Sequence, residues 1–485
     1  TKTIRPLPFF FFVFCFKICI FICHLIMLKH HFATTYTPSQ ITALITTHHP
    51  DWQVCFLNNA HRPVIGICPK VAWTATFDKN LYIHKKTRQA DGVQSLNGRR
   101  YPSTYDNWQH ELTAYANQMN LDDYHGLNHS SYVHGFMGFI SYDLSAHQLN
   151  HRITLKPNQP CGYLAHYDIY LQPIKDGYNL IGMGVCSEFF QHITHQLSDL
   201  LCRCLPTASP IDFQPIWTKT EYAKAFYQTQ EYLKAGDTYQ INLTQKWYAH
   251  LDRLANHLPD LQDTMNAPFA GFLQLGEFEL LSISPELFFE FYKTNGKIHL
   301  ITKPIKGTRP RHADPIIDDE LKQSLANSEK DISENLMIVD LLRNDLGKYA
   351  QIGTVKTPKR FAIESFKNVH HMVSTVTATL SDTHPITVLF GSLPAGSITG
   401  APKKRACEII HELETSPRGA YCGTMGYMNF DGTGSWNVLI RTLQKWQECE
   451  IWAGGGITIK SNVDDEYQEC QDKIGTILAK MSKPK

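Results

Sequence analysis

The sequence has no excess of either charge, and its cysteines follow no ligand-binding pattern. Its 46 Lys and Arg balance 45 Asp and Glu, which leaves a formal net charge of +1 over 485 residues. Without a basic surplus, the composition gives no reason to expect a nucleic-acid partner. The 13 cysteines lack the CxxC spacing of zinc sites and the spacing of a disulfide framework. We therefore expect reduced thiols and a cytoplasmic protein.

One long apolar run stands out, from Pro8 to Leu28. Its length and composition are those of a membrane-spanning helix or a signal anchor. However, Lys17 lies in its middle, no small-residue cleavage pattern follows it, and the first methionine is Met27. We predict that residues 1–35 are a non-native extension, with the real start near Met27 and no membrane association. A genuine membrane anchor is the alternative.

The rest of the chain divides near a polar, proline-bearing segment at residues 207–215. Residues 36–205 alternate short apolar runs with turn residues, which predicts a sheet-rich amino-terminal domain. Residues 215–482 mix helical and strand patterns and would form a second domain. Periodicity alone indicates no more than a mixed α and β chain.

The stretch from Ile301 to Asp345 combines a lysine in a turn with an acidic helix. ITKPIKGTRPR predicts a strand and a proline-framed turn that carries Lys306. SEKDISENLMIVDLLRND predicts a helix that Ser328 or Asp331 caps. Asp331 and Glu334 lie three residues apart and share one helical face. The apolar stripe of this helix is predicted to be Leu336, Val339, Leu342 and Leu346.

A second acidic helix is predicted in NVDDEYQECQDKIGTIL. Glu466 and Glu469 are three residues apart in it, and Lys473 follows one turn later. Two helices that each present a carboxylate pair could share one hard cation with few protein ligands and several waters. Magnesium prefers that coordination. Taken singly, these acidic and basic groups are equally typical of a solvated surface.

Three further polar residues stand in apolar surroundings. Glu286 follows Ser-Pro among Leu, Ile and Phe, so burial would raise its pKa and suit a general acid. The alternative is an exposed turn glutamate. Asn242 belongs to a polar row on the strand 237–247, which faces either solvent or a cleft. Arg441 interrupts an apolar strand predicted at 435–446, and a buried arginine needs an anionic partner.

Six segments of the chain, taken together, resemble the chorismate-utilising enzymes, the family of anthranilate, aminodeoxychorismate, isochorismate and salicylate synthases. They are PIKGTRPR, ENLMIVDLLRNDLG, SITGAPKKRACEII, RGAYCGTMGY, LIRTL and AGGGI with EYQEC. The resemblance is dense over residues 215–480 and weak over 36–200. It implies an α+β fold in which two large, mostly antiparallel sheets pack face to face, with helices outside and the active site in the cleft between the sheets.

The resemblance also assigns roles to single residues. Glu334 and Glu469 match magnesium ligands, with Asp331 and Glu466 behind them. Glu286 matches the proposed proton donor, and His371 matches a histidine near the reacting ring. The residues that match substrate-gripping positions are Gly307, Thr308, Tyr421, Arg441, Gly454, Gly455, Gly456 and Lys473.

Lys306 indicates one branch of the family. Anthranilate synthases carry alanine at this position, whereas aminodeoxychorismate synthases carry lysine, and Asn242 in YQINL also fits the second branch. The resemblance implies that Lys306 attacks C2 of chorismate as the C4 hydroxyl leaves. Ammonia then adds at C4 and expels the lysine, which gives 4-amino-4-deoxychorismate for 4-aminobenzoate and folate synthesis. An amine nucleophile divides a difficult substitution into two steps.

Ammonia would come from a partner, since the sequence has no GxCxGxQ glutaminase motif. We expect a separate glutamine amidotransferase subunit and a separate lyase. Two alternatives stand beside this reading: anthranilate synthase component I, or an inactive, membrane-tethered chorismate-binding subunit. Some relatives bind tryptophan partly through Pro-Phe-Ser. This chain has Pro268-Phe269-Ala270 there, so tryptophan binding stays open.

Overall fold

The computed structural model describes residues 27–89, 97–119, 131–366 and 369–482. The apolar run before Met27 lies outside these residues, and the end of the predicted 1–35 extension, Met27–Ala33, forms strand β1. No helix within the described ranges has the length and apolar character to span a membrane.

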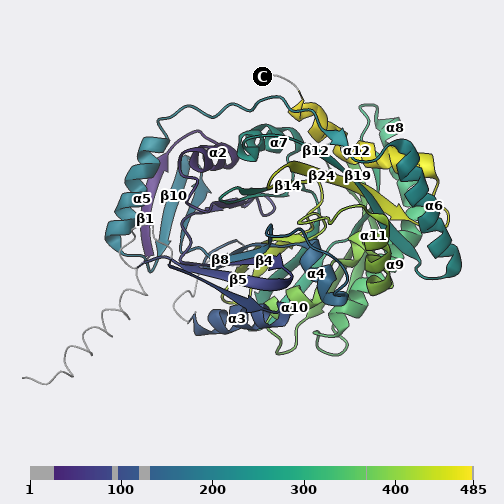
Figure 1. Cartoon of the computed structure of the whole chain (residues 1–485), viewed down its shortest axis with the longest axis horizontal. Helices are drawn as coiled ribbons and strands as arrows, with labels where there is room; N and C mark the ends of the chain where they lie inside the picture. Colours follow the sequence, from purple (N-terminus) through teal and green to yellow (C-terminus); the bar gives the residue numbers. More distant parts are fainter. Residues whose placement is uncertain (1–26, 90–96, 120–130, 367–368, 483–485) are drawn as a thin grey trace, which may run out of the picture.

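Two antiparallel sheets, each of 12 strands in the described residues, make up the fold (Figure 1). Sheet A runs in the order β1, β10 (Gly177–Met183), β9 (Ile169–Ile174), β3 (Val64–Gly66), β2 (Cys55–Leu57), β13 (Phe269–Leu275), β14 (Phe278–Ser284), β23 (Thr442–Lys445), β24 (Cys449–Ile457), β12 (Gln240–Ala249) and β11 (Gln214–Pro215), with β20 (Gly400–Ala401) paired to β12.

Sheet B begins with the strand that carries Lys306. Its order is β17 (Ile305–Pro310), β19 (Val369–Thr379), β16 (Lys297–Thr302), β15 (Leu287–Thr294), β22 (Gly434–Asn437), β21 (Thr424–Asn429), β7 (Gly135–Ile140), β8 (Pro160–His166), β4 (Val71–Asp78), β5 (Asn80–Thr87) and β6 (Asn97–Ser103), with β18 (Lys356–Ser365) paired to β19.

The sheets pack face to face, and helices cover both outer faces. Side chains of both sheets, such as Leu273 and Phe278 from sheet A and Met137 and Phe139 from sheet B, form the core between them. A second core lies under the helices of sheet A: α2 (Pro38–His48), α5 (Ser187–Leu200), α6 (Lys219–Ala235), α7 (Leu258–Met265) and α12 (Val463–Met481).

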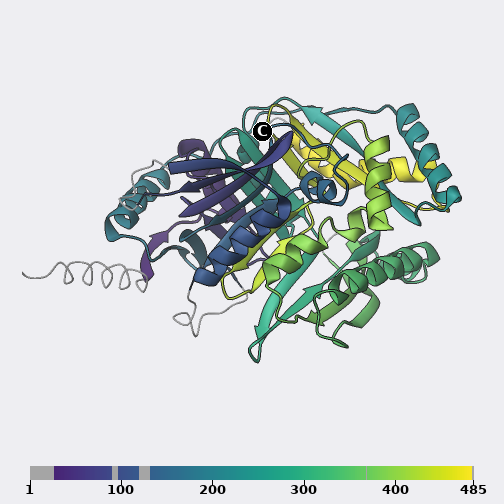
Figure 2. The ribbon, with the colours of Figure 1, turned by 60° about the horizontal axis from the view of Figure 1, so that its bottom comes forward.

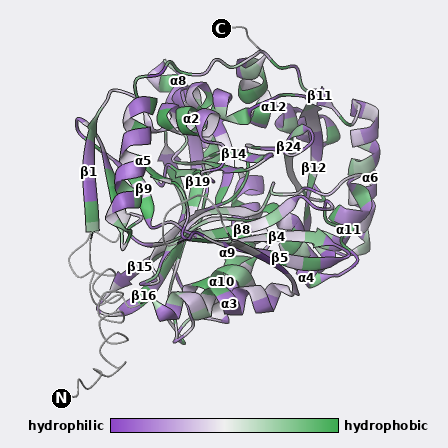
Figure 3. Ribbon diagram, turned by 60° about the vertical axis from the view of Figure 1, so that its left-hand side comes forward, coloured by the Kyte–Doolittle hydropathy of each residue, from purple (hydrophilic) through white to green (hydrophobic). Residues whose placement is uncertain are grey.

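The third core lies under the helices of sheet B (Figure 2). These are α3 (Tyr105–Gln118), α4 (Tyr142–Leu149), α9 (Glu329–Gly347) and α10 (Pro385–Ser392), and α8 (Pro315–Ala326) packs on β17 to β19. Residues of α11 (Lys403–Leu413) join the same core, although this helix packs on β12 and β20 of sheet A. Outer helices such as α3 and α5 carry both hydrophilic and hydrophobic residues, as expected of helices with one buried face (Figure 3). The predicted α+β fold with two antiparallel sheets is confirmed.

Both sheets combine strands from the two predicted domains. For example, β2 pairs with β13 in sheet A, and β7 pairs with β21 in sheet B. The predicted boundary falls in the segment between α5 and β11. The two segments that we predicted as domains therefore interlock through shared sheets.

Two details of the local predictions are wrong. Residues 435–446 are not one strand, because β22 belongs to sheet B and β23 to sheet A. The chain crosses between the sheets at Arg441, whose φ is 50°. On α9, Leu336 is 44% exposed, whereas Asn335 is buried and accepts a hydrogen bond from the Ser374 hydroxyl. The buried face thus includes a polar residue that a hydrophobicity pattern overlooks.

Gly138 on β7 offers a test of the sheet packing. Its φ is 155°, and a Cβ added there would lie 1.9 Å from the Tyr163 carbonyl oxygen of the paired strand β8. We expect Gly138→Ala to lower the free energy of unfolding by about 2–4 kcal/mol. Gly475→Ala on α12 is the control, since an added Cβ meets no atom within 4 Å. In urea unfolding, the midpoint of Gly475→Ala should be equal to or higher than that of wild type, and the midpoint of Gly138→Ala should be lower. Equal midpoints for the two variants would contradict this packing.

Candidate active site

A cavity of about 760 Å³ is lined by β12 and β24 of sheet A, β17 and β19 of sheet B, and the acidic helices α9 and α12. It brings together most of the predicted site residues. These are Asn242, Glu286, Lys306, Gly307, Thr308, Asp331, Glu334, His371, Tyr421, Arg441, Gly454, Gly456, Glu469 and Lys473. Gly455, Glu466 and Pro268–Ala270 do not line it.

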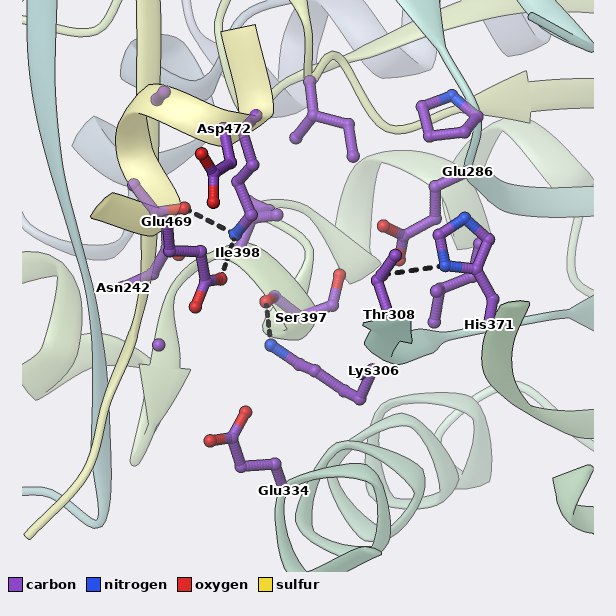
Figure 4. Close-up of a pocket in the computed structure, with 18 of the residues that line it drawn as sticks. Asn242, Glu286, Lys306, Thr308, Glu334, His371, Ser397, Ile398, Glu469 and Asp472 are labelled. Carbon is purple, nitrogen blue, oxygen red and sulfur yellow. Dashed lines mark hydrogen bonds and ion pairs between the residues drawn. The ribbon is translucent and has the colours of Figure 1, made fainter. Parts of the chain in front are cut away.

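Lys306 extends into this cavity from β17. Its Nζ donates to the Ser397 carbonyl at 3.4 Å, and the Glu334 carboxylate lies on its other side (Figure 4). The pairing with β19 shifts register between Lys306 and Thr308, which makes Gly307, at φ 75°, the extra residue of a β-bulge. Bulges re-aim neighbouring side chains, and glycine tolerates the left-handed conformation.

His371 lies beside Thr308 on the cavity wall. The Thr308 hydroxyl and His371 Nδ1 are hydrogen-bonded at 2.9 Å. Burial, together with the Arg441 charge, lowers the pKa of His371 to about 4, so the ring is neutral at pH 7. His370 faces the opposite way and contacts Asp318 and Ser365. The prediction that these adjacent histidines point to opposite faces is confirmed.

Lysine side chains neutralise part of the acidic cluster: Lys473 pairs within α12, and Lys330 joins α9 to α12. Lys473 Nζ contacts Glu469 at 2.6 Å and donates to the Gly454 carbonyl at 2.7 Å. Lys330 Nζ contacts Glu466 at 3.1 Å. Burial raises the pKa of Glu334, and the cations Lys306 and Lys330 oppose that shift. The site is therefore a mixed cluster of carboxylates and ammonium groups.

Gly455 lies against the carboxylates of this cluster and does not line the cavity. A Cβ on Gly455 would lie 2.7 Å from Glu466 Oε2 and 3.2 Å from Glu469 Oε1. The absence of a side chain thus lets the carboxylates of α12 approach β24. Gly454 and Gly456 line the cavity and Gly455 does not, so a backbone contact from Gly455 to a ligand stays a prediction.

Two carboxylate oxygens at this end are buried without a hydrogen-bond partner, Glu334 Oε1 and Glu466 Oε2. A buried carboxylate oxygen without a hydrogen-bond donor lowers the stability of the fold unless a cation binds beside it. No group of three His, Cys, Asp or Glu side chains within the described ranges is arranged as a complete metal site. The donor set fits a hard cation that takes few protein ligands and fills its shell with water and substrate oxygens.

Glu286 and Arg441 also line the cavity. Glu286 is buried at 6% exposure, so the exposed-turn alternative is wrong. Burial raises its pKa to about 7, against the opposing charges of Lys306 and Lys473. Burial also lowers the pKa of Arg441, which the Glu286 charge partly offsets. Tyr421, also in this wall, stacks on Trp452 with ring centroids 6.2 Å apart.

Asn242 reaches the cavity from the polar row of β12, which the structure buries rather than exposes. Gln240, Asn242 and Thr244 are all buried. Arg418 holds this strand in place: its guanidinium donates to the Asn242 carbonyl at 2.6 Å and to the Ile398 carbonyl at 3.1 Å. The expectation of a solvent-facing row is wrong, and the cleft is confirmed for Asn242, the member of the row that lines the cavity.

The Pro268-Phe269-Ala270 segment lies elsewhere, where the start of β13 meets the end of β2. The Asn58 amide donates to the Ala270 carbonyl at 2.8 Å, and the Ala60 amide donates to the Pro268 carbonyl at 2.7 Å. A second cavity, of about 510 Å³, lies nearby and is lined in part by Asn58 and Asn266. Tryptophan binding at this segment stays a prediction.

Four residues of the site escaped the sequence-based prediction: Lys330, Ser397, Arg418 and Trp452. Lys330 directly precedes Asp331, but its partner Glu466 is 136 residues away, so adjacency alone gives no signal. Ser397 accepts from Lys306 through its backbone carbonyl, and its side chain is hydrogen-bonded to Glu286. It begins SITGAPKKRACEII, so its place in a resembling segment was a signal. Arg418 begins RGAYCGTMGY, so its place in a resembling segment was the one available signal.

Fold and cavity together define a protein with a polar cavity lined by both antiparallel sheets. The sequence matches the chorismate binding enzyme family over residues 75–479, and the chain belongs to that family.

Named relatives come from two branches. The chain is 46% identical over 280 residues to aminodeoxychorismate synthase component 1 of Salmonella typhimurium, covering 56% of this chain and 61% of the relative. The chain is also 46% identical over 276 residues to aminodeoxychorismate synthase component 1 of Escherichia coli. That match covers 56% of this chain and 60% of the relative. Anthranilate synthase component 1 of Thermus thermophilus is 36% identical over 271 residues, 55% of this chain and 57% of that protein. The matches thus span about three fifths of these relatives.

Solved structures show the same fold. Anthranilate synthase component I from Streptococcus pneumoniae superposes with a TM-score of 0.71 at 25% identity, covering 86% of this chain and 91% of that one. The isochorismate synthase MenF of Escherichia coli superposes with a TM-score of 0.67 at 16% identity, and the superposition covers 94% of each chain.

Glu286 predicts a pH-dependent stability. Its folded-state pKa, about 7, lies above the ordinary value of 4.5. Its contribution is therefore fully present below about pH 4.5 and is lost as the pH rises through 7, a loss of about 3 kcal/mol. Glu286→Gln should remove this loss, so urea unfolding should show a gain over wild type at pH 8 and little difference at pH 4.5. An equal difference at both pH values would contradict the buried, protonated carboxyl.

Proposed function

We propose that this protein aminates chorismate at C4 with ammonia, forming 4-amino-4-deoxychorismate, with Lys306 as the nucleophile. One observation carries the proposal. Lys306 projects into the cavity between the Glu334 carboxylate and the Ser397 carbonyl, where anthranilate synthases have alanine. The naming of the relatives with 45–46% identity as aminodeoxychorismate synthase component 1 supports it.

Chorismate carries two carboxylates, and the cavity has two ends that suit them. Arg441 and Tyr421 would bind one carboxylate, with Thr308 and the backbone at Gly307, Gly454 and Gly456 around the ring. Glu334 and Glu469 would hold Mg²⁺ at the other end, with Asp331 and Glu466 behind them. When bound, that ion would neutralise the acidic cluster and act as a Lewis acid toward the ring carboxylate.

The reaction balances in two steps. In the first, unprotonated Lys306 Nζ bonds to C2, the two ring double bonds shift, and the C4–O bond breaks. Glu286 would give the departing hydroxyl a proton, so that water leaves. In the second step, ammonia bonds to C4, the double bonds shift back, and the C2–N bond to Lys306 breaks. Asn242 would orient the reacting groups, and neutral His371, held by Thr308, would pack near the ring.

The ammonia would come from a glutamine amidotransferase subunit in a heterodimer with this chain. Support comes from the "component 1" in the names of the relatives and from the lack of a glutaminase motif in the sequence. A separate lyase would release pyruvate and give 4-aminobenzoate for folate synthesis in the cytoplasm.

A product assay tests this function against the anthranilate branch. Purified protein is mixed with chorismate, Mg²⁺ and ammonium at alkaline pH, with and without added aminodeoxychorismate lyase. We expect 4-aminobenzoate only when the lyase is present. Fluorescent anthranilate formed without the lyase would show that the alternative branch is correct.

Lys306→Ala should reduce formation of 4-amino-4-deoxychorismate by more than about 100-fold, the scale on which a lost catalytic group acts. Some anthranilate-type elimination should appear instead. Lys303→Ala is the matched control, because Lys303 lies three residues earlier, on the surface beside Glu364. An unchanged product and rate in Lys306→Ala would rule out the covalent mechanism.

Glu334→Gln should weaken magnesium-dependent chorismate binding by about tenfold or more, because one anionic ligand is lost. Asp340→Asn serves as the control, since this carboxylate lies on the same helix but points to solvent beside Arg343. Calorimetric titration of Mg²⁺ in the presence of chorismate gives the affinities. Identical magnesium affinity in wild type and Glu334→Gln would disprove the ligand assignment.

A further inference from the structure

Within the described residues, one ion pair joins the two acidic helices. Lys330 Nζ, on α9, lies 3.1 Å from Glu466 Oε1, on α12. Glu466 is 1% exposed, and its Oε1 also accepts a hydrogen bond from the Ser461 hydroxyl at 2.6 Å. Lys330 itself lines the cavity. Its ammonium group is therefore the counter-ion of a buried carboxylate, and it links the helices that carry the proposed magnesium ligands.

The lysines of this cluster do not satisfy all of its carboxylate oxygens. The negative charges of Glu334 and Glu469 act on Lys330 together with that of Glu466. Even so, Glu334 Oε1 and Glu466 Oε2 are buried without a hydrogen-bond donor. A single ammonium group is shared among these carboxylates, so a cation of higher charge would be attracted to the same place.

Lys330 is held less firmly than Lys473. Lys473 Nζ contacts Glu469 and also donates to the Gly454 carbonyl at 2.7 Å, so it has a second partner in the cavity wall. The Lys330 side chain is 43% exposed, and among the described residues Glu466 is its one ion-pair partner. An ammonium group that is already in contact with water loses little when it leaves such a pair.

We propose that Lys330 is a displaceable counter-ion of the proposed Mg²⁺ site. In the metal-free protein its ammonium group neutralises Glu466 and ties α9 to α12. It moves into solvent when Mg²⁺ binds, because the two positive charges repel each other. This inference rests on the proposed function, which assigns Glu334 and Glu469 to Mg²⁺. Lys330 thereby sets the magnesium affinity, since the ion has to compete with it for the carboxylates.

Lys330→Met tests the competition, because methionine has a similar length and no charge. Calorimetry at constant ionic strength gives the Kd of the full chain for Mg²⁺, with and without chorismate. We expect this Kd to fall by about threefold to tenfold, because the ion no longer displaces an ammonium group.

Lys219→Met is the matched control. Lys219 pairs with Asp464, also on α12, at 2.7 Å, but neither residue lines the cavity. The control removes the same charge from an exposed pair, so it should change the Kd for Mg²⁺ by less than about twofold. An unchanged or higher Kd in Lys330→Met would overturn the proposal.

Thermal unfolding gives a second readout that does not depend on turnover. Metal-free Lys330→Met should melt below wild type, because the buried Glu466 carboxylate loses its partner. A fixed concentration of Mg²⁺ should then raise the melting temperature of the variant more than that of wild type. An equal rise in the two proteins would contradict displacement of Lys330 by the ion.

Amine labelling of wild-type protein covers the case in which the variant does not fold. Reductive methylation of Lys330, read by peptide mass spectrometry, should increase at saturating Mg²⁺ and matched ionic strength, whereas methylation of Lys219 should not change. Equal labelling of Lys330 with and without Mg²⁺ would overturn the proposal. If wild type binds Mg²⁺ and Lys330 stays protected, the displacement alone is disproved. If wild type binds no Mg²⁺ in the presence of chorismate, the magnesium assignment of the proposed function fails as well.

Discussion

The buried guanidinium of Arg418 is the interaction on which the rest of the site depends. It donates to both oxygens of Glu414, at 2.8 and 2.7 Å, and to the carbonyls of Ile398 and Asn242. It thereby joins α11, the loop before it and β12. Removing one partner of such a buried pair costs about 3–5 kcal/mol, so these segments cannot shift independently. Since the carbonyl that accepts from Lys306 belongs to Ser397, next to Ile398, the same interaction helps set the position of the lysine.

Carboxylates and cationic side chains both line the cavity, but they are paired differently in its two parts. Lys330 and Lys473 contact Glu466 and Glu469 at the acidic end, whereas Arg441 stands without an ion pair among the described residues at the other. The proposed dianionic substrate would therefore meet two different environments. One would offer the Arg441 guanidinium, while the other would accommodate a further anion only if a cation joins it. This asymmetry would orient chorismate with C2 toward Lys306, and it links the proposed magnesium requirement to substrate orientation.

Features that depend on residues close together in the sequence could be predicted, whereas features that depend on residues far apart in the sequence could not. The acidic helices were predictable, because Asp331 and Glu334 lie on one helical face by spacing alone. The resemblance supplied the sheets and most of the cavity-lining residues. Features set by pairing between distant strands were not predictable. The chain crosses sheets at Arg441, Gly307 forms a bulge against β19, and Gly455 lies against the carboxylates of α12. Each of these depends on which strand or helix becomes a neighbour, and a local pattern does not contain that information.

We propose that Lys306 forms a covalent bond to chorismate during turnover. Intact-protein mass spectrometry of the enzyme, quenched with acid after mixing with chorismate and Mg²⁺ in the absence of ammonia, tests it directly. The account predicts a species heavier than the protein by the mass of chorismate less one water, located on the peptide that contains Lys306 and discharged when ammonium is added. If the protein turns over chorismate with ammonium but never carries that added mass, the covalent role of Lys306 is contradicted.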